Sequence, residues 1–210
     1  MTTTAHRHVA AWVDHEPVDE AEVDAALARL RSGPRAALLP VAGSAEGRQL
    51  RRWVTQTVVT TRLLEREAAR VGPLRATSLA EIAPDRMAAL QLGGVVANVL
   101  AEFAAARAVF AHVTSGCNVS PDQAKAYHRR NPDQFADAHG VEHPLDAMKD
   151  MNAVDTVDAV AAAITSMLLA ASRRRYFINW LGVRSAESIH LEPGYEHPGD
   201  PRQPDATHRH

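Results

Sequence analysis

Histidines gather near both ends of the sequence, and imidazole is the side chain that could do chemistry there. His6 and His8 are two residues apart, so on a strand their side chains point to the same face. Six late residues extend the set of possible ligands: His190, His197, Asp200, Asp205, His208 and His210. Imidazole and carboxylate groups suit zinc, nickel or iron. If the first and last strands pair antiparallel, His6 and His8 come close to His190, which predicts a metal site. Solvated histidines with incidental metal affinity are the alternative, because no compact motif such as His-Glu-x-x-His is present.

Residues 193–210 are rich in proline and histidine and form a predicted tail or lid. This composition does not pack a core. The run His197-Pro198-Gly199-Asp200-Pro201 nevertheless favours a defined path over a surface. The candidate lid residues are Tyr195, His197, Asp200 and Asp205. The sequence assigns no catalytic residue.

Other reactive side chains give weaker signals. His139 and His143 are four residues apart, but Pro144 disfavours the helix that would align them, so a loop without a ligand role is predicted. Cys117 is the single cysteine, which rules out an internal disulfide and gives no reason to expect an oxidising compartment. Cys117 also has no clear base near it in sequence.

Charge and hydropathy argue against two classes of partner. The net charge is −2 with neutral histidines, so the whole chain has no electrostatic attraction to nucleic acid. The run of residues 173–175, three arginines, would spread around three sides of a helix. No stretch reaches 18 apolar residues, so no membrane span is predicted. The N-terminus lacks the charged start and long apolar run of a signal peptide, and we expect a cytoplasmic protein.

The first half of the chain reads as a strand followed by helices. Residues 9–13 are a predicted strand, and residues 15–18 a turn. Asp19 is a predicted cap for a helix that runs to about Arg31. The strongest helical pattern runs from Ser44 or Glu46 to Val71, with apolar residues at three- and four-residue spacing. Gly72 and the proline after it end this helix.

The second half is predicted to be helical until its last strand. One helix is expected over residues 85–113, with a possible kink at Gly93-Gly94. Ser120 and Pro121 have the residue types of an N-cap and a first helical position. The helix they begin is expected to close at Asn131-Pro132. Asp155 or Thr156 starts a broad apolar helix to about Leu181, and residues 188–191 are a predicted closing strand.

These elements predict a mainly α fold. We expect five to six helices around one core, with a short terminal two-stranded β-ribbon. One domain is predicted over residues 1–192, with a loop at 136–153 and the tail at 193–210. The tryptophans and methionines are assigned either to the core or to an apolar cleft, since the sequence does not separate these roles.

Four segments carry a resemblance to a known family. They are the run VSPDQAKAYHRRNPDQF at 119–135, the turn VDHEPVD at 13–19, the helix RQLRRWVTQTVVTTRLLEREAARVG at 48–72 and the stretch AITSMLLAASRRRYFINWLGVRS at 163–185. In this order they resemble the N-terminal helical domain of SurA/parvulin-type folding factors. About twenty residues stand where that family carries its much longer prolyl isomerase domain. The resemblance implies a SurA N-domain-like fold without isomerase activity, in which the strand at 188–191 pairs with the strand at 9–13.

Two functions follow as expectations. The resemblance implies a chaperone-like module that binds unfolded or extended polypeptide in a helical cradle. The alternative is an accessory enzyme of a small-molecule, natural-product biosynthetic pathway. In that case His197, Asp200, His208 and His210 would fold over a cleft and supply metal-binding or acid/base groups. The client or substrate and the oligomeric state are left open.

Overall fold

The computed structural model describes residues 8–72, 74–132 and 153–197. These residues form two compact units. Unit 1 comprises residues 8–113 and 177–197, and unit 2 comprises residues 114–132 and 153–176. The domain predicted over residues 1–192 therefore spans both units.

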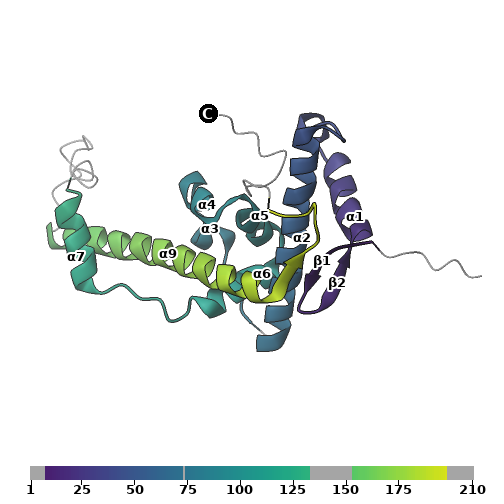
Figure 1. The fold of residues 1–210 in the computed structure, drawn as a ribbon. Coiled ribbons are helices and arrows are strands. Elements are labelled where there is room, and N and C mark those ends of the chain that lie inside the picture. The colour runs from purple at the N-terminus through teal and green to yellow at the C-terminus, as the bar shows by residue number, and fades with distance from the viewer. Residues whose placement is uncertain (1–7, 73, 133–152, 198–210) are drawn as a thin grey trace, which may run out of the picture. The chain divides into compact units, whose positions relative to one another are not determined.

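A small sheet joins the beginning and the end of unit 1. Its strands are β1 (Val9–Val13), β2 (Glu16–Asp19) and β3 (Ile189–Leu191), in the order β2-β1-β3 with antiparallel pairing throughout (Figure 1). The predicted pairing of the first and last strands is confirmed. The predicted two-stranded ribbon is wrong, because the expected turn residues form β2. The turn itself is only Asp14-His15, whose φ values of 46° and 69° suit a tight two-residue hairpin.

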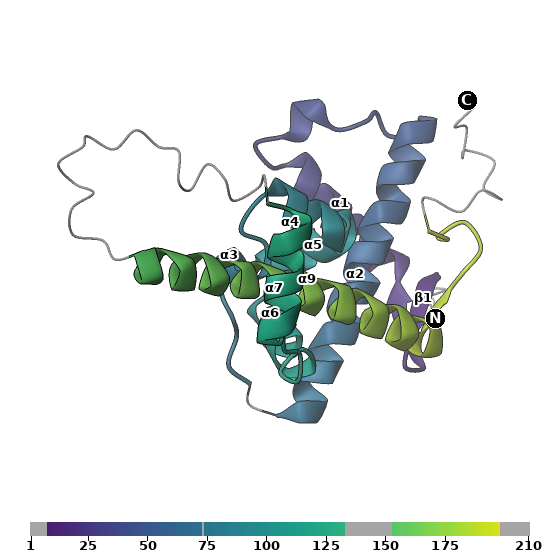
Figure 2. The same cartoon turned by 90° about the vertical axis from the view of Figure 1, so that its left-hand side faces the viewer.

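Two capped helices follow the hairpin. Helix α1 (Glu20–Arg31) begins after Asp19, whose backbone N–H donates to Glu22 Oε1 at 3.2 Å. Helix α2 (Ala45–Val71) begins after Ser44, whose hydroxyl accepts from the Gly47 N–H at 3.0 Å. These starts agree with the predicted ones. Helix α2 packs against α1, α5, α6 and β1, and Figure 2 shows α1 and β1 beside it.

The helix expected over residues 85–113 is three helices. They are α4 (Arg86–Leu92), α5 (Gly94–Glu102) and α6 (Ala104–Val113). Gly93, at φ 79°, separates α4 from α5, and α5 and α6 are bent by 111° at Phe103. A short 3-10 turn (Ala36–Leu38) and α3 (Leu79–Ile82) complete this region. The described residues thus contain eight α-helices rather than five or six.

The core of unit 1 lies between α2, the α5–α6 pair, the sheet and the end of α9 (Ala153–Ser188). Phe177 of α9 is fully buried, and its ring centroid lies 5.0 Å from that of Phe110 and 5.6 Å from that of Trp180. No single helix among the described residues is both long and apolar enough to cross a membrane. The bent α5–α6 pair passes that test by length and composition alone.

Unit 2 contains α7 (Pro121–Arg130) and the first part of α9. Ser120 and Gln123 form a reciprocal cap: the Gln123 N–H donates to Ser120 Oγ at 3.2 Å and the Ser120 N–H donates to Gln123 Oε1 at 2.8 Å. The predicted helix from Pro121 to the Asn131-Pro132 stop is confirmed. Most of the predicted loop at 136–153 lies outside the described residues.

Candidate functional site

Two cavities lie between α7 and α9 within unit 2. The first groove has a volume of about 440 Å³ and is lined by Val119, Ala124, Lys125, His128, Val160 and Ile164, among others. The second groove has a volume of about 490 Å³, and its lining includes Asp122, Tyr127, Arg130, Leu168, Ser172 and Arg175. Val119 lines both grooves, so they approach each other at the start of α7. Each volume is in the range of about 300–1,000 Å³ that ligand pockets have.

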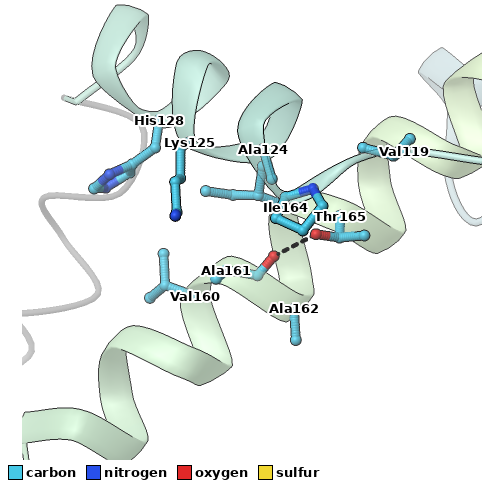
Figure 3. Close-up of a pocket in the computed structure, with 10 residues that line it drawn as sticks. Val119, Ala124, Lys125, His128, Val160, Ala161, Ala162, Ile164 and Thr165 are labelled. Carbon is cyan, nitrogen blue, oxygen red and sulfur yellow. Dashed lines mark hydrogen bonds between the residues drawn. The ribbon is translucent and has the colours of Figure 1, made fainter.

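Because of the helical repeat, different faces of α7 line the two grooves. Pro121, Ala124, Lys125 and His128 recur at three- and four-residue intervals and line the first groove (Figure 3). The intervening positions of the helix line the second groove. On α9, the first groove is lined by residues around 160–165, and the second by residues 168, 172 and 175.

The floor of the first groove is apolar. Ala124 and Ile164 are buried, with 4% and 2% of their surface exposed. Thr165 is the polar exception on α9, but its hydroxyl donates to the Ala161 carbonyl at 2.8 Å, as Figure 3 shows. Since this hydroxyl is bonded within its own helix, a bound molecule would meet mainly aliphatic carbon there.

An uncharged stretch of α9 runs under both grooves. Residues 160–172 include no Asp, Glu, Lys or Arg. Ala161, Ala162 and Ala163 are nevertheless exposed, and Met167 is 41% exposed. A helix that lacks charges on all sides is usually buried against another surface. The exposed positions therefore leave apolar surface of α9 uncovered by the other described residues.

The charged side chains that line the grooves are mostly positive. Lys125 lines the first groove, and Figure 3 shows it at the edge facing Val160, with His128 beside it. Arg130 and Arg175 line the second groove together with Asp122. The first groove therefore combines an aliphatic floor with one lysine, and the second groove has a more polar lining with two arginines and one aspartate.

The histidines predicted to bind metal are separated where the structure describes them. His190 lies opposite Trp12 in the sheet, and His8 is four residues before Trp12 in the chain. This register puts His8 and His190 on the order of 13 Å apart along the strand, so their predicted closeness is wrong. His8, His190 and His197 are all exposed. Among residues 8–72, 74–132 and 153–197, no group of three or more His, Cys, Asp and Glu side chains is arranged to hold a metal ion.

The remaining predicted ligands and lid residues lie outside the described residues. They are His6, Asp200, Asp205, His208 and His210. His139 and His143 also lie there. The metal site and the tail-covered cleft of an accessory enzyme therefore stay predictions.

Tyr195, predicted as a lid residue, is held on α1 and α2 in unit 1. Its hydroxyl donates to Glu20 Oε1 at 2.6 Å and accepts from Arg51 Nη2 at 3.2 Å, and the Arg51 guanidinium lies 5.6 Å from the ring centroid. The backbone beside it is also held, since Arg52 Nε donates to the Gly194 carbonyl at 3.3 Å. Burial, followed by the hydrogen bond to Glu20, raises the pKa of Tyr195, so the phenol stays protonated at neutral pH. The start of the tail therefore follows a defined path, over α1 and α2.

Comparison with known proteins gives one partial match. Residues 9–46 match a family model described as "Family of unknown function (DUF7158)". The matched stretch covers β1, β2, α1 and the 3-10 turn and ends at the first residues of α2. No curated protein and no solved structure matches the chain.

The grooves themselves were not singled out by the sequence. Val160, Ala161 and Ile164 belong to the broad apolar face predicted for the last helix, where they read equally well as core. The sequence feature that could have revealed the grooves is the uncharged run at 160–172. A helix that buries only one face would carry charged residues on its other face within a run of this length.

Proposed function

We propose that the chain is a polypeptide-binding helical module that holds an extended or partly folded segment in the two grooves beside α7. The main observation in support of this proposal is the pair of adjoining grooves over the uncharged, partly exposed stretch of α9. Helix-lined grooves of this kind bind partners by burying apolar anchors. The module holds its client without chemistry, which agrees with the expectation from the SurA-type resemblance.

The shape of the site favours a polypeptide over a compact small molecule. The two grooves lie on different faces of α7, share Val119 at its start, and together border α9 from Val160 to Arg175. These positions are 15 residues apart, which corresponds to about 22 Å along a helix. A flexible segment of more than about seven residues reaches that far and can pass the start of α7, with side chains in each groove.

An aggregation assay tests this function. A chemically unfolded client is diluted into buffer with the full chain, and light scattering is followed over time. Ala161→Asp places a charge in the first groove, and we expect it to abolish most of the suppression of aggregation, because the carboxylate would be desolvated by a bound apolar anchor. The matched control is Ala163→Asp, since Ala163 is also exposed on α9 but does not line either groove.

The aggregation assay distinguishes three outcomes. Suppression by the wild-type chain and by Ala163→Asp, with loss in Ala161→Asp, supports the proposal. Equal activity of the two variants would place client binding elsewhere on the chain. No suppression at a several-fold molar excess of the wild-type chain would reject a holding function.

A further inference from the structure

We propose that the two grooves select polypeptide segments in which apolar anchors are flanked by Asp or Glu. This inference rests on the proposed function and names the chemistry of the client. The evidence for it is the set of charged side chains around the grooves, because binding an apolar segment to the floor would not require them.

The rim charges come from both helices. Lys125 and Arg130 are exposed on α7, and Arg175 is exposed on α9. Arg130 Nε donates to the Ala126 carbonyl at 3.1 Å, which fixes the guanidinium along α7. Among the residues that line the grooves, these three cations face one carboxylate, Asp122. A client with acidic flanks would meet complementary charge on both sides of α7.

Lys125 lies beside the apolar floor of the first groove, and this position determines which part of a bound client it can contact. Lys125 is one residue from the buried Ala124, which is part of the floor of the first groove. An apolar side chain seated over Ala124 and Ile164 would therefore bring the adjacent residues of its own chain toward Lys125. Exposed charges act mainly on partner choice and on the rate of encounter, and their effect falls as salt rises.

The same charges could attract nucleic acid, but the groove lining favours polypeptide. Proteins that bind single strands without sequence preference stack successive bases on aromatic rings. Tyr127 is the one Phe, Trp or Tyr among the residues that line the two grooves, and His128 adds a single imidazole. The first groove offers aliphatic carbon, which suits Leu, Ile, Val or Met anchors rather than bases.

Peptide binding to the full chain tests the selection. Three fluorescein-labelled peptides share one Leu-rich centre and carry four flanking residues that are Glu, Gln or Lys. Fluorescence anisotropy is measured in 50 mM and 300 mM NaCl. We expect the Glu-flanked peptide to bind about tenfold more tightly than the Lys-flanked peptide at low salt, with the difference shrinking to about twofold or less at high salt.

Charge reversal identifies the residues responsible. Lys125→Glu is expected to weaken the Glu-flanked peptide about fivefold and to strengthen the Lys-flanked one. Arg129→Glu is the control, because Arg129 is exposed on the same helix but does not line either groove, and its effect should stay below about twofold. Circular dichroism confirms that both variants remain folded.

The outcomes separate the two proposals. If all three peptides bind equally, the charge selection is rejected and the holding function stands. If none binds, the holding function itself fails. A poly(dT) oligonucleotide that binds as tightly as the Glu-flanked peptide, with the same loss in Lys125→Glu, would reassign the grooves to nucleic acid. Dimerisation in light scattering that Lys125→Glu abolishes and the peptide does not displace would reassign them to self-association.

Discussion

The carboxylate of Asp14 ties the β1–β2 turn to two helices. Asp14 Oδ2 lies 3.3 Å from Arg66 Nε and 3.2 Å from Arg70 Nη2. A hydrogen bond with the Ser188 side chain is the largest influence that lowers the pKa of Asp14, and the positive charges of Arg70, Arg66 and Arg184 add to it. The turn, α2 and the end of α9 are thus held together by one ionised group.

Removing that charge should change how stability depends on pH. Because the folded-state pKa of Asp14 is lowered, its contribution is fully present above the unfolded-state pKa and is lost as pH falls through the folded-state value. Asp14→Asn is expected to lower the free energy of unfolding by about 1 kcal/mol at pH 7. The difference from the wild type should fade below about pH 4.

Urea unfolding at pH 7, 5, 4 and 3 measures this difference. Asp24→Asn is the comparison, since Asp24 pairs with Arg51 but its side chain is 59% exposed. We expect Asp24→Asn to cost less than about 0.5 kcal/mol. A pH-independent difference between Asp14→Asn and the wild type would show that the ionised carboxylate is not the stabilising group.

Residues 193–197, which we call the strap, hold helix α1 against helix α2. Tyr195 packs with the apolar cluster between these helices and bonds to Glu20 of α1 and Arg51 of α2. Tyr195→Phe keeps the ring but loses both hydrogen bonds, so we expect it to lower the free energy of unfolding by about 1 kcal/mol. Tyr195→Ala should cost about 2 kcal/mol or more, because the ring contacts are lost as well.

Thermal unfolding of both variants measures these losses. His197→Ala is the control, because His197 is exposed two residues further along. If Tyr195→Ala unfolds at the wild-type temperature, the strap does not stabilise the α1–α2 pair.

Element boundaries with side-chain caps were predictable from sequence. Asp19, Ser44 and Ser120 each lie where a polar side chain precedes a helical pattern, and each is the N-cap in the structure. Gly93 was recognised as a possible kink and separates two helices. The break at Phe103, where α5 and α6 are bent by 111°, was not predicted, because no glycine or proline marks it.

The strand register and the grooves needed three-dimensional information. The pairing of β1 with β3 was implied by the SurA-type resemblance, but the alignment of Trp12 with His190 was not. One residue of register changes which side chains meet. The apolar face of the last helix could be predicted from residue spacing. The residues of that face that stay open beside α7 could not be predicted, because they depend on how the two helices pack.

For the whole molecule, β3 and Tyr195 close unit 1 from the C-terminal side. A chain that ends after His197 keeps both and is the reference for urea unfolding. Ending it after Ser188 removes β3 and Tyr195, which should lower the free energy of unfolding by about 3 kcal/mol or more. Similar stability of the two shortened chains would mean that β3 and the strap do not complete unit 1.

The central place of β1 in the sheet has a consequence for synthesis. Strand β1 can pair with β2 as soon as both have left the ribosome, but its other edge has no partner strand until residues 189–191 emerge. During that interval the nascent chain exposes unpaired backbone groups and the apolar positions that Phe177 and Leu181 later cover. Unit 1 therefore closes only after residues 189–191 have emerged, and premature termination anywhere before β3 leaves an edge open to wrong partners.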